Sequence, residues 1–352
     1  ARPPRPDRLE ITFLPGLGEV VRDEVVEVLR PPRPPRPVPG RDDAIGLDLP
    51  GWDRRVLTLR TAVAVFASLH LDVPRPRSMV SGEHLGRIAA AVRASLALAP
   101  SRAFRFEAAG SRSADFTRLG AELAQVVGLP YAPDDGELVV TVRRGHAAHP
   151  GQGVDPGWDV LVRLGPRPLS ARTWRVVDYP GAANATIAAA MVRLAGLRPT
   201  DRVLNLMCGS GTLLVERLLA GPAATAVGVD LSDEALDAAR ANLTAAAADA
   251  RLTRADATDP TVLGDERFDL LLADPPWGTL HGSHADSPRL HEGLLAAAHR
   301  LAAPGARLVV LTHEITVMEH ALRDADGFWR ADPALRVFAK GHHPRVYVLH
   351  RR

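Results

Sequence analysis

Helix-like and strand-like segments alternate from Ala182 to the end of the 352-residue chain, and this alternation limits the fold more than any other feature. Short apolar runs bounded by Gly, Pro or Asp are typical of buried strands, and the segments between them carry apolar residues at helical spacing. The pattern predicts an α/β domain, in which helices cover both faces of a parallel sheet. The last two strand-like runs, 335–338 and 345–349, predict an antiparallel hairpin at the sheet edge. The expected helices are 183–195, 212–219, 233–243, 289–301 and 314–323, and the expected strands before the hairpin are 202–206, 225–229, 251–254, 268–273 and 307–311.

The first half of the chain has a different pattern, in which short strands surround single helices. Strands are expected at 9–14, 44–49, 65–71, 103–107, 137–143 and 158–164, and helices at 19–29, 83–98 and 115–127. We therefore expect two α+β units, residues 1–100 and 101–168, followed by a linker at 169–181 and the α/β domain at 182–352. Six prolines between Pro31 and Pro39 predict an extended, exposed loop.

Composition excludes several protein classes. Hydrophobic residues make up 46% of the chain and charged residues 24%, a balance typical of folded rather than disordered proteins. Cys208 is the one cysteine, which excludes a disulfide framework. No apolar run approaches the roughly 20 residues of a membrane helix, and no secretory leader is expected, so we expect a cytoplasmic protein without a membrane partner.

Charge is unevenly divided along the chain. Residues 1–180 hold 25 Arg and 21 Asp or Glu, whereas residues 181–352 hold 18 basic and 20 acidic side chains. A mildly basic front half suits a polyanionic partner, although an ordinary solvated surface accounts for it equally well.

A glycine-rich turn joins the first strand of the α/β region to a helix. The run from Asn205 through Cys208, Gly209 and Gly211 lies where open α/β sheets bind nucleotides, and glycines let the backbone approach a ligand closely. A dinucleotide fingerprint needs a third glycine, but Leu214 occupies that position, so the sequence argues against NAD and FAD.

Acidic residues end the next two strands. Asp230 stands 21 residues after Gly209, where a carboxylate can accept both hydroxyls of a ribose, and Asp256 can accept from an adenine amine. These loops together predict one adenosine-like ligand. Alternatively, Asp230 only caps the helix that begins near Asp233.

The string Asp274-Pro275-Pro276-Trp277 ends the fourth strand. Consecutive prolines make a stiff turn that presents the Asp274 carboxylate and the Pro275 carbonyl as two acceptors, with an indole beside them. Two acceptors can hold a planar amine toward an electrophile and take the released proton, while Trp277 stacks on the base. We predict catalytic roles for all four residues.

These motifs resemble those of class I S-adenosylmethionine-dependent methyltransferases that modify amino groups, with a Rossmann-like fold. The resemblance implies that the glycine loop contacts the methionine part of the cofactor, Asp230 the ribose, Asp256 the adenine and Asp274 the target amine. Asn205 stands where an acidic residue is usual and can still accept a hydrogen bond. The residues expected to bind S-adenosylmethionine are Asn205, Cys208, Gly209, Gly211, Asp230, Leu231, Asp256, Ala257 and Asp274.

The front half looks like that of THUMP-domain RNA methyltransferases that make N2-methylguanosine in tRNA. The segments that carry this resemblance are Glu10–Leu17, Phe104–Gly165, Gly181–Gly196 and Gly341–Leu349. It implies that a ferredoxin-like unit (1–100) and a THUMP-like unit (101–168) grip the RNA, most simply as a monomer. Two other functions stay open: a DNA adenine-N6 methyltransferase, and an RNA-binding protein that has lost catalysis, because Asn205 and Leu280 depart from the usual residues.

Histidines follow the catalytic turn and recur in the last hairpin. Without further cysteines or clustered carboxylates, we expect no metal site and interpret these side chains as solvated loop residues. They are His281, His284, His291, His342 and His343.

Overall fold

The computed structural model describes residues 6–146, 155–259, 261–276, 287–339 and 341–352. The chain forms two compact units, one made of Ala1–Phe13 and Val21–Ala171 and the other of Leu14–Val20 and Arg172–Arg352. The expected boundary between residues 100 and 101 falls inside the first unit, and the boundary between the two units falls inside the expected linker 169–181. No helix of the described chain is both long and apolar enough to cross a bilayer.

One seven-stranded sheet, in the order β2-β3-β1-β4-β7-β6-β5, runs through the first unit. It joins the two segments that the sequence suggested as separate units, because β4 pairs with β7 from Phe66–Arg163 to Leu71–Trp158. Its strands are β1 (Arg8–Thr12), β2 (Arg36–Pro37), β3 (Ala44–Asp48), β4 (Ala64–Leu71), β5 (Phe104–Glu107), β6 (Leu138–Arg144) and β7 (Trp158–Arg163). The helices are α1 (Gly18–Leu29), η1 (Arg54–Thr58), η2 (Pro76–Val80), α2 (Gly82–Leu98) and α3 (Ala114–Val127).

Local sequence signals explain most of these elements. Helix α3 begins after Ser113, whose side chain accepts from the Phe116 amide, and ends at Gly128, whose φ of 70° an L side chain rarely adopts. The proline-rich segment departs from the expected loop, because Arg36 and Pro37 pair with Gly46 and Ile45 as the edge strand β2. An edge position tolerates proline, since one side of the strand needs no ladder hydrogen bond.

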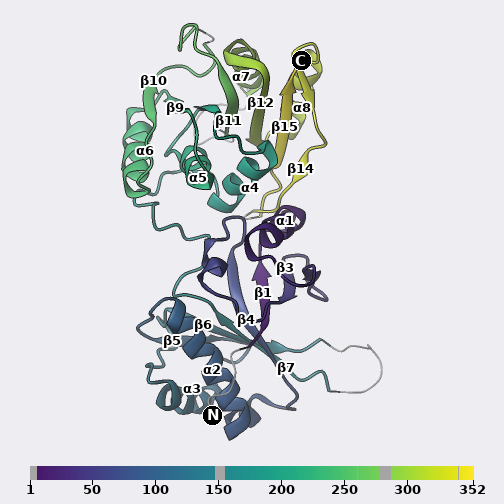
Figure 1. Ribbon diagram of the computed structural model, residues 1–352, viewed down its shortest axis with the longest axis vertical. Helices are drawn as coiled ribbons and strands as arrows, with labels where there is room; N and C mark the ends of the chain where they lie inside the picture. Colours follow the sequence, from purple (N-terminus) through teal and green to yellow (C-terminus); the bar gives the residue numbers. More distant parts are fainter. Residues whose placement is uncertain (1–5, 147–154, 260, 277–286, 340) are drawn as a thin grey trace. The chain divides into compact units, whose positions relative to one another are not determined.

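The second unit is the expected α/β domain (Figure 1). Its sheet has the order β10-β9-β8-β11-β12-β15-β13, with β14 pairing β15, and the strands from β10 to β12 are parallel. The strands are β8 (Arg202–Leu206), β9 (Thr225–Asp230), β10 (Arg251–Arg254), β11 (Phe268–Ala273), β12 (Ala302–Thr312), β13 (Trp329–Ala331), β14 (Leu335–Arg336) and β15 (Arg345–Arg351). The helices are α4 (Ala185–Ala195), α5 (Thr212–Ala220), α6 (Asp233–Ala245), α7 (Ser287–Leu301) and α8 (Ile315–Asp324).

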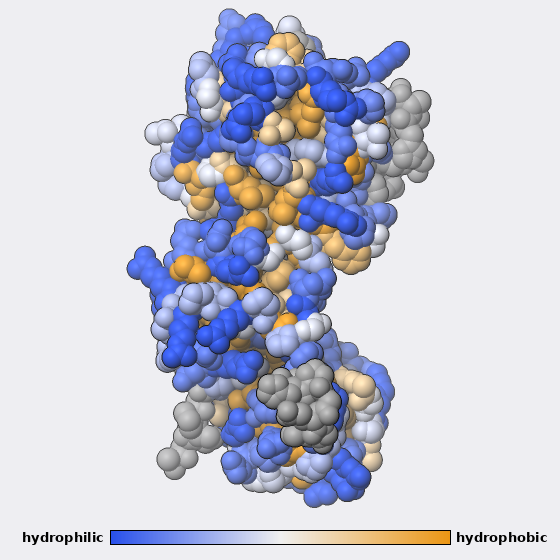
Figure 2. Space-filling model, turned by 90° about the vertical axis from the view of Figure 1, so that its right-hand side faces the viewer, coloured by the Kyte–Doolittle hydropathy of each residue, from blue (hydrophilic) through white to orange (hydrophobic). Residues whose placement is uncertain are grey.

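The antiparallel end of this sheet confirms the expected hairpin and extends it. Strand β15 pairs antiparallel with β14 and also with β12 and β13, of which β13 was not expected. Leu204 and Leu206 of β8 pack with Leu294 of α7 and Met318 of α8 in one core cluster. Because side chains alternate along a strand, Asn205 faces the opposite side of the sheet. Hydrophilic residues cover most of the visible face of each unit, which is consistent with apolar residues lying in the cores (Figure 2).

Candidate active site

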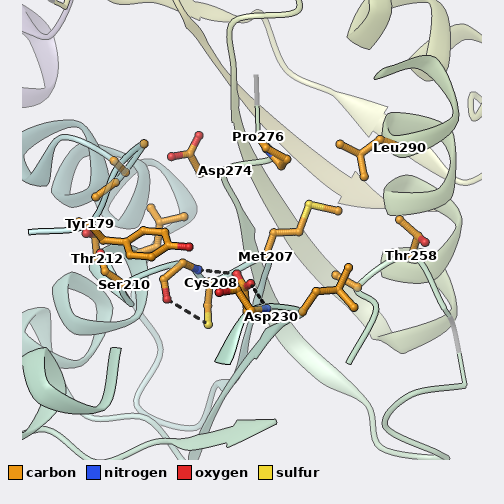
Figure 3. A pocket seen from close by; sticks show the side chains of 18 of the residues that line it. Tyr179, Met207, Cys208, Ser210, Thr212, Asp230, Thr258, Asp274, Pro276 and Leu290 are labelled. Atoms are coloured by element: carbon orange, nitrogen blue, oxygen red, sulfur yellow. Dashed lines mark hydrogen bonds between the residues drawn. The ribbon is translucent and has the colours of Figure 1, made fainter. Parts of the chain in front are cut away.

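A cavity of about 560 Å³ lies at the carboxyl ends of the parallel strands in the second unit (Figure 3). In an open α/β sheet this edge is where ligands bind. Of the predicted site residues, those that line the cavity are Cys208, Gly209, Asp230, Leu231, Asp256, Ala257, Asp274 and Pro276. The structure therefore brings together residues from the ends of β8, β9, β10 and β11.

The loop after β8 has an unusual backbone. Met207 has a φ of 52° and Gly209 the same value, and the Cys208 amide donates to Val229 O at 2.9 Å. A left-handed φ at a non-glycine residue stores strain and is found at functional sites. Burial and the nearby Asp230 raise the pKa of the Cys208 thiol, so the thiol stays protonated at neutral pH.

Asp230 is held by backbone donors. Its Oδ2 accepts from the Gly209 amide at 2.8 Å and its Oδ1 from the Ser232 amide at 3.0 Å. The alternative role as a helix cap is wrong, because the Ser232 hydroxyl accepts from Ala235 N and caps α6. Each Asp230 oxygen keeps a further lone pair, so the carboxylate can also accept hydroxyl groups in the cavity.

Asp256 is fixed in a similar way by its own loop. Its Oδ1 accepts from the amide of Thr258 at 2.8 Å and from the hydroxyl of Thr258 at 2.7 Å. Leu231, with 61% of its surface exposed, and Ala257 flank these carboxylates on the cavity wall. Hydrogen bonds within the protein thus fix the orientation of both carboxylates, Asp230 and Asp256.

Asp274 has a different environment. Within the described part of the chain its carboxylate receives no hydrogen bond, and desolvation by burial raises its pKa from the usual 3.8 to about 7. A perturbed carboxyl group in a cavity is a candidate for acid–base chemistry. Pro276 lines the cavity beside it, whereas Trp277, Leu280, His281 and His284 lie outside the described residues.

Three predicted residues do not reach the cavity wall. Asn205 is fully buried within the sheet, where its Nδ2 donates to Leu206 O at 3.2 Å and to Leu272 O at 3.1 Å. Gly211 has a φ of 79°, and a Cβ there would lie 3.2 Å from that of Ala239, so this glycine serves the packing of α5 on α6. Pro275 is buried and is not among the lining residues.

One wall that the sequence did not indicate comes from the segment before α4. Residues Tyr179 to Ala183 line the cavity, and we call Arg172–Ala183 the strap. Asn242 of α6 is fully buried and holds the strap: its Oδ1 accepts from Val176 N at 3.0 Å and Val177 N at 3.1 Å. Its Nδ2 donates to Ser210 O at 3.1 Å, which ties the strap to the glycine loop. These contacts join residues far apart in sequence, and no local motif marks them.

Arginines fasten the rest of the strap. Arg175 donates to Ala183 O at 2.8 Å and to Thr212 Oγ1 at 2.9 Å. Arg172 forms a buried ion pair with Glu216 at 2.8 Å. The expected linker is therefore, from Arg172 onward, part of the cavity-bearing unit.

The opposite wall, also missed, consists of Ser287, Arg289, Leu290 and Glu314. His291 braces it from behind and is fully buried on α7, so the expectation of a solvated loop histidine is wrong here. Its ring binds Ser287 O through Nδ1 at 2.9 Å and Thr312 Oγ1 through Nε2 at 3.1 Å. A carbonyl only accepts, so Nδ1 carries the proton, and burial lowers the pKa of His291, which keeps the ring neutral.

The two histidines of the last hairpin differ from His291 in their exposure. His342 and His343 are exposed, as predicted. Among the residues that the structure describes, no group of three or more His, Cys, Asp or Glu side chains could hold a metal ion.

Comparisons with known proteins agree with this geometry. The family described as UPF0020, RMKL-like methyltransferase domain, matches residues 172–345. A tRNA (guanine(6)-N2)-methyltransferase of Thermus thermophilus is 31% identical over 97% of this chain and 98% of its own length. A tRNA (guanine(10)-N2)-dimethyltransferase of Methanothermobacter thermautotrophicus is 33% identical over 37% of this chain and 38% of its own.

Two solved structures match this chain over nearly its full length. TrmN from Thermus thermophilus superposes with a TM-score of 0.74 at 28% identity, covering 98% of this chain and 99% of its own. A putative methyltransferase solved with S-adenosylhomocysteine, SMU.472, has a TM-score of 0.67 at 13% identity over 99% of both chains, and this likeness concerns the fold alone.

Proposed function

Because residues 172–345 form an RMKL-like methyltransferase domain and the chain belongs to the same family as the tRNA (guanine(6)-N2)-methyltransferase of Thermus thermophilus, we propose that it methylates the N2 amine of a guanosine in tRNA. The observation that carries the proposal is the position of Asp274. This carboxyl group ends β11 in the cavity, next to loops suited to an adenosine-like ligand, and its pKa is raised to about 7.

The residues present fit S-adenosylmethionine, the cofactor of this family. A cavity of about 560 Å³ lies within the usual range for ligands of this size. Asp230, held toward the cavity by two amides, would accept the ribose hydroxyls, Asp256 the adenine amine, and the loop at Gly209 would lie along the methionine part. When bound, the cofactor supplies an electrophilic methyl carbon attached to a sulfonium.

The chain's own contribution to the reaction centres on Asp274. The lone pair of a guanine amine is delocalised into the ring, so the nitrogen reacts best when an acceptor takes one of its hydrogens. The Asp274 carboxylate accepts an N–H of the amine, orients the nitrogen and takes the proton released as the new N–C bond forms. A pKa of about 7 lets the group accept this proton and then return it to water near neutral pH. That Pro275 supplies a second acceptor and that Trp277 stacks on the base stay predictions.

We assign tRNA binding to the first unit, with residues 1–100 ferredoxin-like and 101–168 THUMP-like, and catalysis to the second unit, which includes the expected linker from Arg172 onward. The excess of basic residues before position 181 supports this assignment. A paired base is inaccessible, so the target guanosine leaves its stack to enter the cavity. We place the protein in the cytoplasm, acting as a monomer. Phosphate contacts release counterions, so tRNA affinity should fall steeply with salt while cofactor affinity changes little.

The decisive experiment is incubation of the full chain with methyl-labelled cofactor and tRNA, rRNA or DNA, followed by nucleoside analysis. We expect N2-methylguanosine in tRNA, at position 6 as the name of the full-length relative suggests. A transcript with adenosine at position 6 is the matched control. N6-methyladenine in DNA would replace the proposal with the alternative enzyme. Cofactor or tRNA binding without label in any polymer would indicate a protein that has lost catalysis.

A further inference from the structure

The order of strands divides the cavity into two sides. Strands β10, β9 and β8 lie on one side of β11, and β12 lies on the other. The ends of β10, β9 and β8 carry Asp256, Asp230 and the glycine loop, whereas Glu314 follows the end of β12. Asp274, after β11, stands between the two sides. A base whose amine faces Asp274 and the cofactor therefore extends over β11 and β12.

The wall on the β12 side is one braced structure. Ser287, Arg289 and Leu290 belong to the first turn of α7, and Glu314 precedes α8. His291 joins them, since it binds Ser287 O on one side and Thr312 Oγ1 on the other, and Thr312 Oγ1 also accepts the Glu314 amide at 3.0 Å. Arg289, which is exposed, and Glu314 thus place a cation and an anion on the same wall of the cavity, opposite the cofactor loops.

We propose that Glu314 and Arg289 select guanine by reading the edge of the base that adjoins the methylated amine. This inference rests on the proposed function and names its specificity residues. Guanine presents the N1–H donor next to the N2 amine and the acceptors O6 and N7 beyond it. A carboxylate accepts from N1–H, and a guanidinium donates to O6 and N7, which is the commonest arginine contact with guanine.

The same pair rejects adenine. When the N6 amine of adenine takes the place of the guanine N2 amine at Asp274, the N1 acceptor of adenine faces the Glu314 carboxylate and its C2–H faces the Arg289 guanidinium. The first contact is repulsive and the second leaves the guanidinium without an acceptor, so adenine is excluded by a wrong partner as well as by a missing one. The wall therefore accounts for the choice of base that Asp274 alone does not make, because a lone carboxylate accepts from either amine.

The test uses a base that keeps the target amine but lacks the N1–H donor and the O6 acceptor that guanine presents beside it. The full-length protein is assayed on tRNA with guanosine or with 2-aminopurine at the target position, and kcat/KM is measured for both. 2-Aminopurine retains the C2 amine, lacks O6 and has an unprotonated N1. We expect wild type to prefer guanosine by roughly 10- to 100-fold. In Glu314→Gln the carboxamide can donate to N1, and in Arg289→Gln the contact with O6 is weakened, so both variants should bring this ratio toward one.

Matched controls lie on the same two helices. Glu319→Gln removes a carboxylate of α8 that pairs with Arg345, and Arg300→Gln removes a guanidinium from the last turn of α7. Both should keep the wild-type ratio.

The intrinsic reactivity of guanosine and 2-aminopurine cancels, because only the change of the kcat/KM ratio between proteins is compared. Cofactor affinity, measured by calorimetry, should change less than about twofold in Glu314→Gln, since each assigned cofactor residue lies on the other side.

Two results would overturn the inference while leaving the proposed function intact. One is a wild-type enzyme that methylates both tRNAs equally well, and the other is a pair of variants that lose activity on both by the same factor. The second result would mean that the wall is only structural. Absence of N2-methylguanosine from the wild-type reaction would instead overturn the proposed function, and this inference with it.

Discussion

On the β9 side of the cavity the carboxylate of Asp230 accepts hydrogen bonds from two backbone amides, whereas on the β11 side the carboxylate of Asp274 receives none from the described residues. Burial raises the pKa of Asp274 to about 7. The described residues thus give hydrogen bonds to the predicted ribose acceptor and none to the predicted proton acceptor.

The difference has a physical reason. A binding carboxylate gains affinity when it is already oriented, because less freedom is lost as the ligand arrives. A proton acceptor works best with a pKa near the operating pH, and withholding hydrogen-bond donors from a buried carboxylate raises its pKa. Such a group is destabilising in the folded protein, which is a common feature of functional sites.

The largest effect is expected from Asp274→Ala. Loss of the proton acceptor should lower kcat by roughly 10²- to 10⁴-fold, while the cofactor dissociation constant stays within a few fold of wild type. Single-turnover transfer to tRNA and calorimetry measure the two quantities. Asp265→Asn, a change at a carboxylate that is 99% exposed before the same strand, is the control. Turnover within a few fold of wild type would remove Asp274 from the reaction.

Asp230→Ala should instead affect cofactor binding. We expect cofactor binding to weaken by roughly 1–3 kcal/mol, because the ribose loses charge-assisted acceptors and the Gly209 amide loses its partner. Calorimetry with the cofactor measures the change, and Asp233→Ala, at a 68% exposed neighbour, should leave affinity unchanged. An equal loss in both variants would argue that the ribose binds elsewhere.

The sequence predicted the parts of this site that local patterns determine. Strands β8, β9 and β11 follow from short apolar runs, and residues at their carboxyl ends meet at one edge of a parallel sheet. Asp230 and Asp274 could therefore be placed together from the sequence alone. Gly211 was placed in the same loop correctly, but its neighbour is Ala239 rather than the cavity. Packing between two helices leaves no mark in a single strand–turn–helix motif.

Contacts between distant segments account for what was missed. The strap is held by Asn242, 66 residues from Val176, and nothing in a run of Ala and Asn indicates that partner. His291 lay inside the expected helix 289–301 but was interpreted as a solvated loop residue, because the sequence does not mark the two atoms that bind its ring, Ser287 O and Thr312 Oγ1. Strand β13 has three residues, too few for a period of two to be recognised.

Asn242→Ala tests whether cofactor affinity depends on the hydrogen bonds between Asn242 and the strap. Two strap amides and the Ser210 carbonyl lose their partner, so we expect the free energy of unfolding to fall by about 1–2 kcal/mol and cofactor affinity to drop several-fold. Denaturant titration and calorimetry measure both. Asp237→Ala, on the exposed face of the same helix, is the control. A loss of stability with unchanged cofactor affinity would show that the strap does not shape the cofactor side.

The smallest expected effect is on the pH dependence of the free energy of unfolding. It measures how much the ionised Asp274 carboxylate destabilises the folded protein. The pKa of Asp274 rises from 3.8 to about 7 on folding, so between these values the folded protein binds more protons than the unfolded chain, and this group makes wild type less stable as the pH rises. Asp274→Asn does not titrate. The stability of this variant relative to wild type should therefore increase from pH 4 to pH 7 and stay constant above, reaching about 1 kcal/mol once the partial exposure of the side chain is taken into account. Denaturant midpoints of both proteins, measured from pH 5 to pH 8.5, give the difference. A difference that does not change with pH would mean that Asp274 titrates near its ordinary value and is already ionised when the base arrives, so that the contrast with Asp230 would lie in position alone.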